Sequence, residues 1–351
     1  MKSNIKRILS ILLSLTAVLS LCACGAELSD SASSKVVTSF TDNAISDVST
    51  SDSEIPSGTG SSVSSESSEV ASASEDSSST SSAEVSSKGY VDGPDKLKVI
   101  SYNIRYANDG ENKNISDRAP RLKAVVDKYD PDLFGLQEVT PTWRGILEDY
   151  FLDEYDWVFK ERNSGDECTP IFWKKDKFEK VKEGYFWLSG TPDVQSNTWG
   201  GNCYRIVSWV RLKSKSTGNE FLYYNTHYDF GHEIQEKSSN LILQKAASEG
   251  AFTDYAMILT GDFNMRPNSD GYNVFTAEKM IDVNRKLGYD KTPTTNGYNE
   301  DLDTENGHRI IDYCFCDKTF VKPVTYKVLN EKINGGYVSD HRGVYVEIEV
   351  N

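Results

Sequence analysis

The sequence predicts one domain of the α/β or α+β class, built from short strands and longer helices. Short apolar segments between polar residues alternate with segments in which apolar residues recur at helical spacing. Polar residues collect at the ends of the apolar segments, where folds of this class gather ligand-binding groups. Residues 95–351 carry this pattern and are enough for one large domain with a sizeable core.

The predicted elements follow from local patterns. Apolar and β-branched runs predict strands at residues 97–102, 133–136, 169–173, 206–212, 221–224, 256–259, 310–316 and 344–350. Leu122 and Val125 stand at helical spacing after Pro120, so a helix is expected over residues 121–129. A second helix is expected over residues 234–248. This alternation of strands and helices favours a mixed sheet content.

The N-terminus has the order of an export signal. Three basic residues among the first seven precede an apolar run, residues 8–23, which is shorter than the roughly 20 residues that a membrane-spanning helix needs. The sequence Leu-Cys-Ala-Cys-Gly at residues 21–25 resembles a bacterial lipobox. This resemblance implies a lipoprotein signal peptide over residues 1–23 and lipid on Cys24, so the protein would be exported and anchored to the outer face of the bacterial cell membrane. An uncleaved anchor and an ordinary secretory signal are the alternatives, and each also places the domain outside the cytoplasm.

Residues 24–94 have the composition of a disordered tether. Serine fills 16 of the 32 positions from residue 57 to residue 88, and this stretch contains no aromatic residue. Such a segment cannot bury enough apolar surface to offset the entropy lost when a chain becomes ordered. We therefore expect it to be a solvated spacer between the membrane and the domain.

Export affects the reading of the four cysteines in the domain, because an oxidising compartment permits disulfides. Cys314 and Cys316 fall on the same side of a predicted strand and are expected to be small core residues. A bridge between Cys168 and Cys203 is one arrangement that the spacing leaves open. No C-x-x-C spacing is present, so a zinc site built from cysteines is not expected.

The chain is acidic, with a formal net charge of −15. A broad nucleic-acid-binding surface usually has a basic excess, so the charge gives no support to one. Acidity is compatible with a pocket in which a metal ion meets a phosphate group.

Candidate functional residues cluster around the ends of the predicted strands. Asparagine, histidine and carboxylate side chains follow or open these strands at Asn103, Glu138, Asn225, His227, Asp262, Asn264, Asp340 and His341, and Asp312 lies within one. Converging carboxylates would be costly in a protein interior without a cation or a charged ligand. The pattern therefore favours a metal site.

Six segments then occur in the order typical of one superfamily. They are VISYNIR (residues 99–105), LQEV (136–139), NTHYD (225–229), TGDFN (260–264), RIIDY (309–313) and SDH (339–341). In this order they resemble the endonuclease/exonuclease/phosphatase superfamily, which is related to deoxyribonuclease I, over residues 95–351. The resemblance implies a four-layer sandwich, in which two mixed β-sheets pack face to face and are flanked by helices. It also implies a catalytic domain that hydrolyses phosphate esters.

The resemblance and the needs of ester hydrolysis together assign roles. Mg²⁺, or Mn²⁺ as an alternative, would be held by Glu138, Asp340 and the carbonyl of Asn103. The other assignments are His341 as general base, Asp312 as the carboxylate that orients it through a hydrogen bond of about 2.6 to 3.2 Å, Asp262 as the group that orients water, and Asn225, Asn264 and His227 as donors to the phosphate. Arg105 and Arg205 either contact phosphate or form salt bridges.

One departure from the resemblance concerns the leaving group. Many members of a bacterial branch continue the His227 motif as Asn-Thr-His-x-Asp-His, whereas this chain has Phe230 at the last of these positions. His232 follows two residues later. His232 and His308 match no motif position and are expected at the surface. A substrate preference different from that of these relatives is therefore expected.

The sequence leaves several functions open. An extracellular nuclease that acts on phosphodiesters is the leading expectation, with a nucleic acid as its partner. A phospholipid or sphingomyelin phosphodiesterase that recognises a lipid headgroup is the second. A catalytically silent binding lipoprotein on the same scaffold is a different class, and loss of a metal or base residue would favour it. The sequence has no such loss, and we expect a monomeric enzyme.

Deleting residues 25–93 from a soluble form of the protein should leave the melting temperature and turnover unchanged, because this segment lacks core-forming residues. Thermal denaturation and a phosphoesterase assay of both forms measure the two quantities. A large loss of either would contradict the interpretation of the segment as a tether.

Overall fold

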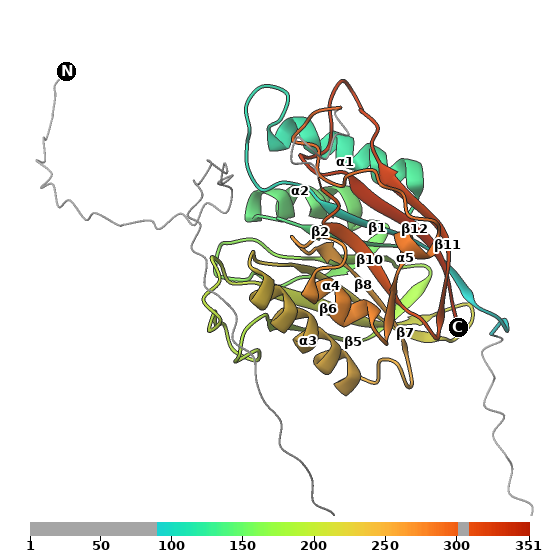
Figure 1. The fold of residues 1–351 in the computed structure, drawn as a ribbon. Coiled ribbons are helices and arrows are strands. Elements are labelled where there is room, and N and C mark those ends of the chain that lie inside the picture. The colour runs from blue at the N-terminus through green and yellow to red at the C-terminus, as the bar shows by residue number, and fades with distance from the viewer. Residues whose placement is uncertain (1–89, 301–308) are drawn as a thin grey trace, which may run out of the picture. The chain divides into compact units, whose positions relative to one another are not determined.

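The computed structural model describes residues 90–300 and 309–351 (Figure 1). The predicted signal peptide, lipidated Cys24, nearly all of the serine-rich segment and His308 lie outside these residues and stay predictions. Within the described ranges, no helix has the length and apolarity needed to span a bilayer.

The first sheet has six strands in the order β11-β12-β1-β2-β4-β3. Their bounds are β1 Asp95–Asn103, β2 Leu133–Gln137, β3 Tyr155–Val158, β4 Ile171–Lys174, β11 Val321–Leu329 and β12 Gly343–Val350. The pair β1–β2 is parallel and the other pairs are antiparallel. The sheet is therefore mixed, and the ends of β1 and β2 lie at the same edge of the sheet.

The second sheet also has six strands, in the order β5-β6-β7-β8-β10-β9. Their bounds are β5 Phe178–Trp187, β6 Ile206–Ser214, β7 Glu220–His227, β8 Ala256–Asp262, β9 Met280–Asp282 and β10 Asp312–Asp317. Here β7 and β8 form the parallel pair. As in the first sheet, two strands therefore end together at one edge.

Helices α1 and α2 cover the outer face of the first sheet, and α3 and α4 cover that of the second (Figure 1). The bounds of the helices are α1 Ile115–Tyr129, α2 Pro141–Phe151, α3 His232–Ser248, α4 Asp270–Thr276 and the short α5 Val283–Lys286. One apolar cluster joins the first sheet to α1 and α2, and another joins the second sheet to α3 and α4. A third cluster fills the space between the sheets. This arrangement confirms the four-layer sandwich.

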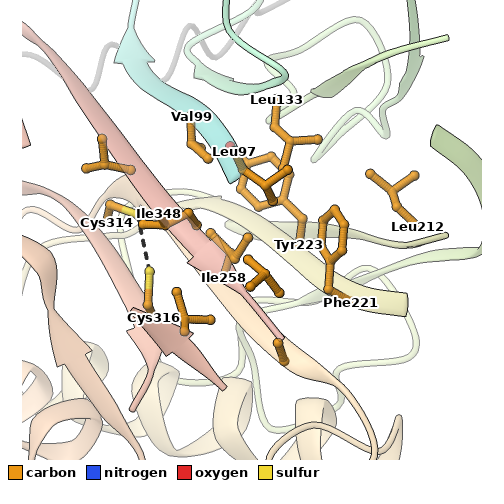
Figure 2. Close-up of a cluster of buried hydrophobic side chains, with 14 of the residues drawn as sticks. Leu97, Val99, Leu133, Leu212, Phe221, Tyr223, Ile258, Cys314, Cys316 and Ile348 are labelled. Atoms are coloured by element: carbon orange, nitrogen blue, oxygen red, sulfur yellow. Dashed lines mark hydrogen bonds between the residues drawn. The ribbon is translucent and has the colours of Figure 1, made fainter. Parts of the chain in front are cut away.

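The core between the sheets contains side chains from both (Figure 2). Val99 and Leu133 come from the first sheet, and Tyr223 and Ile258 come from the second. The predicted core cysteines, Cys314 and Cys316, also lie here, with their sulfur atoms 3.9 Å apart. Cys168 is a buried free thiol elsewhere, so its bridge to Cys203, considered from the sequence, does not form.

The predicted start of the first helix is wrong. Helix α1 begins at Ile115 and includes Pro120, which was expected to precede it. Upstream, the Asp117 carboxylate accepts a hydrogen bond of 3.1 Å from the backbone N–H of Asn114. This contact fixes the first turn before the proline is reached, and a proline removes only one helical hydrogen bond.

The close approach of the two sheets limits the size of residue 135. A Cβ atom on Gly135 would lie 2.6 Å from Asn225 Cγ and 2.8 Å from Thr260 Oγ1. The change Gly135→Ala should therefore lower the free energy of unfolding by about 2 kcal/mol, as measured by urea denaturation. Gly145 in α2 has no atom within 4 Å of such a Cβ, so Gly145→Ala is the matched control. It should raise stability by about 0.5 kcal/mol, and equal effects of the two changes would refute the contact.

Candidate active site

The sheet registers bring most of the predicted site residues to one edge of the sandwich. In the first sheet, Asn103 pairs with Gln137 at the parallel ends of β1 and β2. In the second sheet, Asp262 of β8 pairs with His227 on one side and with Asp312 on the other. These strand ends carry buried polar groups rather than apolar ones. The two edges together form the candidate active site.

Asn103 connects the two sheets within this site. Its Nδ2 donates hydrogen bonds of 2.9 Å to Glu138 Oε1 and of 2.9 Å to Asp262 Oδ2. Its Oδ1 accepts the backbone N–H of Arg105 at 3.0 Å. The predicted role was different, because the carbonyl oxygen was expected to face the metal. In this orientation Asn103 instead holds two carboxylates in place.

Glu138 and Asp340 are the two carboxylates that the sequence predicts as metal ligands, and the charge of Asp340 acts on Glu138. Glu138 follows β2 in a left-handed backbone conformation, with φ of 62°, and its Oε2 accepts the backbone N–H of Tyr106 at 2.8 Å. Burial, and then the negative charge of Asp340, raise the pKa of the Glu138 carboxyl. Two neighbouring carboxylates favour a bound cation, and hard oxygen ligands suit Mg²⁺ or Mn²⁺. The residues present therefore fit a divalent metal.

Asp312 and His341 form the predicted pair. The Nδ1 of His341 lies 3.0 Å from Asp312 Oδ2, which confirms the expected hydrogen bond. The other ring nitrogen, Nε2, lies 3.8 Å from Asp262 Oδ2. Burial lowers the pKa of the His341 imidazole, but the carboxylates of Asp312 and Asp262 raise it by more, so the net shift is well above the ordinary value. A cation at Glu138 and Asp340 would oppose that rise.

Asp262 lies at the centre of the site and is almost fully buried. Burial, followed by the nearby carboxylate of Asp312, raises the pKa of Asp262 to about 6. Three possible ligand atoms lie within 4.8 Å of one another here, one each from the carboxylates of Asp262 and Asp312 and from the imidazole of His341. This group could hold a second cation.

His227 and Asn264 line the side of the site opposite the first sheet. Asn264 Nδ2 lies 3.2 Å from His227 Nε2, and the Asn264 backbone N–H donates to Asp262 Oδ1 at 2.9 Å. Burial, and then the positive charges of Arg205 and Arg162, lower the pKa of His227 well below its ordinary value. The imidazole is therefore neutral near pH 7, with one ring nitrogen that donates a hydrogen bond and one that accepts a hydrogen bond.

Glu167 and Arg162 are neighbours of His227 that the sequence interpretation missed. Glu167 Oε2 lies 3.9 Å from His227 Nδ1 and 2.9 Å from Arg162 Nη1. Burial raises the pKa of Glu167 to about 7. A signal was present, because Glu167 precedes a strand predicted from Thr169. That strand is β4, which runs antiparallel to β2 and therefore begins at the edge where β2 ends, so the residues before it lie near the site.

Asn225 does not reach the site, so its predicted role as a phosphate donor is wrong. Its side chain is fully buried between the sheets. The two N–H groups of Nδ2 donate to the backbone oxygens of Leu136 at 2.8 Å and Pro170 at 3.0 Å. Its Oδ1 accepts from Gln137 Nε2 at 2.8 Å. All its donors are therefore used within the protein, and Asn225 links the sheets instead.

The two predicted arginines differ in position. Arg105 Nε lies 3.1 Å from Asp109 and 3.8 Å from Asp340, so it borders the metal site through salt bridges. Arg205 is buried behind His227, in a cavity of only about 10 Å³ that Glu167 also lines. Such a cavity has room for about one water molecule, which excludes direct contact between Arg205 and a phosphate group.

The motif order, the fold and this site together define the class of protein. The chain matches the model of the Endonuclease/Exonuclease/phosphatase family over residues 100–341 and belongs to this family. Its members hydrolyse phosphate esters, and the family is metal-dependent.

Three solved structures are similar to this chain. An endonuclease/exonuclease/phosphatase family protein from Bacteroides thetaiotaomicron is 32% identical, with 74% of this chain and 99% of that chain covered and a TM-score of 0.67. A mannosyl-6-phosphatase from the same organism is 33% identical, with 72% and 99% covered and a TM-score of 0.65. D. rerio TDP2, complexed with single-strand DNA product, is 21% identical, with 72% and 98% covered and a TM-score of 0.58. At that identity it supports the fold alone.

The separate positions of Asp312 and Asp340 predict separate losses. Asp312→Asn should misorient the His341 imidazole and lower turnover by about 100-fold, with little change in metal affinity. Asp340→Asn should instead weaken metal binding. Steady-state kinetics and calorimetric titration with Mg²⁺ distinguish the two. If Asp312→Asn weakened metal binding as much as Asp340→Asn, the assignment of Asp312 to the imidazole would be wrong.

Proposed function

We propose that this protein is an Mg²⁺-dependent phosphoesterase, exported and anchored through lipid on Cys24, that acts on phosphate esters of carbohydrates. The observation that carries the hydrolytic activity is the set of three carboxylates, the buried Glu138 and Asp262 and the partly exposed Asp340, beside the paired imidazole of His341. Export rests on the leader sequence, and Mn²⁺ is an alternative metal. The similarity to the mannosyl-6-phosphatase, at 33% identity, supports a carbohydrate phosphate ester as substrate.

The mechanism follows from the positions of the side chains. A metal bound at Glu138 and Asp340 would offset the charge that develops on the phosphoryl oxygens during attack. Asp262 and His341 Nε2, 3.8 Å apart, would both accept hydrogen bonds from the attacking water, and His341, once unprotonated, would take the proton of that water as the new P–O bond forms. His227 and Asn264, 3.2 Å apart, lie on the side of the second sheet, where they would meet the phosphate. The ester P–O bond breaks, and the leaving oxygen receives a proton from solvent, because the neutral His227 imidazole can donate a hydrogen bond but is too weak an acid to lose its proton.

Nucleic acid and lipid substrates are less well supported. The nuclease expectation drew on the superfamily, but the chain is acidic overall and the DNA-bound neighbour has only 21% identity. No described feature favours a lipid headgroup. DNA, RNA and phospholipid therefore enter as arms of the test. The catalytically silent alternative has no support from the residues, because the metal and base side chains are all in place.

The proposal predicts a metal-dependent activity that requires Glu138. Mannose 6-phosphate, p-nitrophenyl phosphate, bis-p-nitrophenyl phosphate, plasmid DNA, RNA and phospholipid are assayed with Mg²⁺ and with chelator. The phosphomonoesters should be hydrolysed only with metal, and Glu138→Gln should lower turnover by about 100-fold because it removes an anionic ligand. Glu179→Gln, on the exposed edge of β5, is the control and should have no effect.

Different outcomes reject different parts of the proposal. Faster turnover of DNA, RNA or phospholipid than of any sugar phosphate would reject the carbohydrate assignment. Chelator-resistant activity would reject the metal. No hydrolysis of any substrate would support the catalytically silent class.

A further inference from the structure

A cavity of about 300 Å³ opens beside the candidate active site. It lies between the loop that joins β7 to α3 and the segment that follows β8. Its lining includes Phe230, Asn264, Arg266, Ser269 and Arg309. Asn264 also lies 3.2 Å from His227, so the cavity adjoins the phosphate site. A group attached to the phosphate can therefore extend into it.

Phe230 provides an aromatic surface to the cavity. Half of Phe230 is exposed, although the strand end that precedes it is buried. It occupies the position where many relatives of the motif have histidine. An exposed ring in a cavity with polar groups favours a ligand with both an apolar face and hydrogen-bonding edges, as a sugar ring has.

Two arginines give the cavity a positive charge in an otherwise acidic chain. Arg266 and Arg309 are both exposed, and neither forms an ion pair with any residue in the described ranges. The Ser269 Oγ is buried and has no hydrogen-bond partner among the same residues. Arginine recognises phosphate and carboxylate groups with paired hydrogen bonds. The cavity thus has unused donors for an anion.

We propose that this cavity binds the leaving group of the substrate, and that this leaving group is a sugar ring carrying a second anionic group, either phosphate or carboxylate. Phe230 packs against the ring, and Arg266 and Arg309 bind the anion. The inference rests on the proposed function and adds the charge of the leaving group to it.

Three esters of the same anomeric phosphate test the inference. Glucose 1-phosphate has a neutral leaving group, whereas glucose 1,6-bisphosphate and glucuronic acid 1-phosphate have anionic ones. With Mg²⁺, kcat/KM should be at least about tenfold higher for one or both of the anionic esters, and the comparison between them identifies the preferred anion. The double variant Arg266→Gln/Arg309→Gln should lose this preference and retain its rate with glucose 1-phosphate.

A matched control removes the same charge elsewhere. Lys279 and Lys318 are exposed beyond the far end of β10, where the Lys318 N–H donates to the Lys279 carbonyl oxygen at 3.1 Å. The double variant Lys279→Gln/Lys318→Gln should keep the preference for anionic esters. Equal losses in both double variants would overturn the inference, as would an equal or faster rate of the unchanged protein with glucose 1-phosphate.

A binding measurement separates this inference from the proposed activity. Calorimetric titration of the unchanged protein with D-glucuronate and with D-glucose requires no hydrolysis. D-glucuronate should bind at least about tenfold more tightly, and only the arginine variant should abolish this difference. If no ester were hydrolysed but this binding pattern held, the proposed function would fail and the anion site would stand. Equal binding of the two sugars would overturn the anion site even in an active enzyme.

Discussion

The side-chain amide of Asn103 is the contact on which the arrangement of the active site depends. It donates one hydrogen bond to Glu138 on the first sheet and one to Asp262 on the second. Both carboxylates are buried, and each would repel the other without a donor between them. The position of Glu138, a proposed metal ligand, relative to Asp262 is therefore set by one fully buried amide.

A second asparagine extends the same principle deeper into the sandwich. The side-chain amide of Asn225, on β7, donates hydrogen bonds to the backbone oxygens of Leu136 and Pro170 on the side of the first sheet. Its place is open only because Gly135 has no side chain. The sheets are thus held in register by polar contacts near the site and by apolar packing farther away. Because both contacts span the sheets, fold stability and active-site geometry share the same residues.

Whether a strand was predicted from the sequence depended on whether it lies inside a sheet or at its edge. All eight interior strands of the two sheets were expected from apolar runs, whereas β3, β5, β9 and β11 were missed, and these are the four sheet edges. An edge strand has one unpaired side and carries more charge, as β5 does with Lys180, Lys182 and Glu183. The apolar pattern is therefore weakest where the sheet ends.

The sequence predicted most of the residues of the candidate site, but it predicted the orientation of their side chains less well. Glu138, Asp312 and His341 were identified because they lie at or next to the ends of predicted strands, and strand pairing brings such ends to one edge. The orientation of Asn225 depends on space created by a glycine on another strand, which sequence spacing does not encode. Glu167 was missed because it precedes its strand, and only the antiparallel pairing of β4 with β2 shows that this start lies at the site edge.

The left-handed backbone at Glu138 places a functional side chain at a strained position that lowers the stability of the fold. A residue other than glycine or asparagine in this conformation costs about 1 kcal/mol or more, and Arg105 carries the same strain with φ of 60°. Glycine at either position would relax the backbone and remove a functional side chain at once. Selection of variants for thermal stability alone would therefore favour glycine at these two positions and so remove side chains at the proposed metal site. Selection for turnover as well as stability would keep both residues.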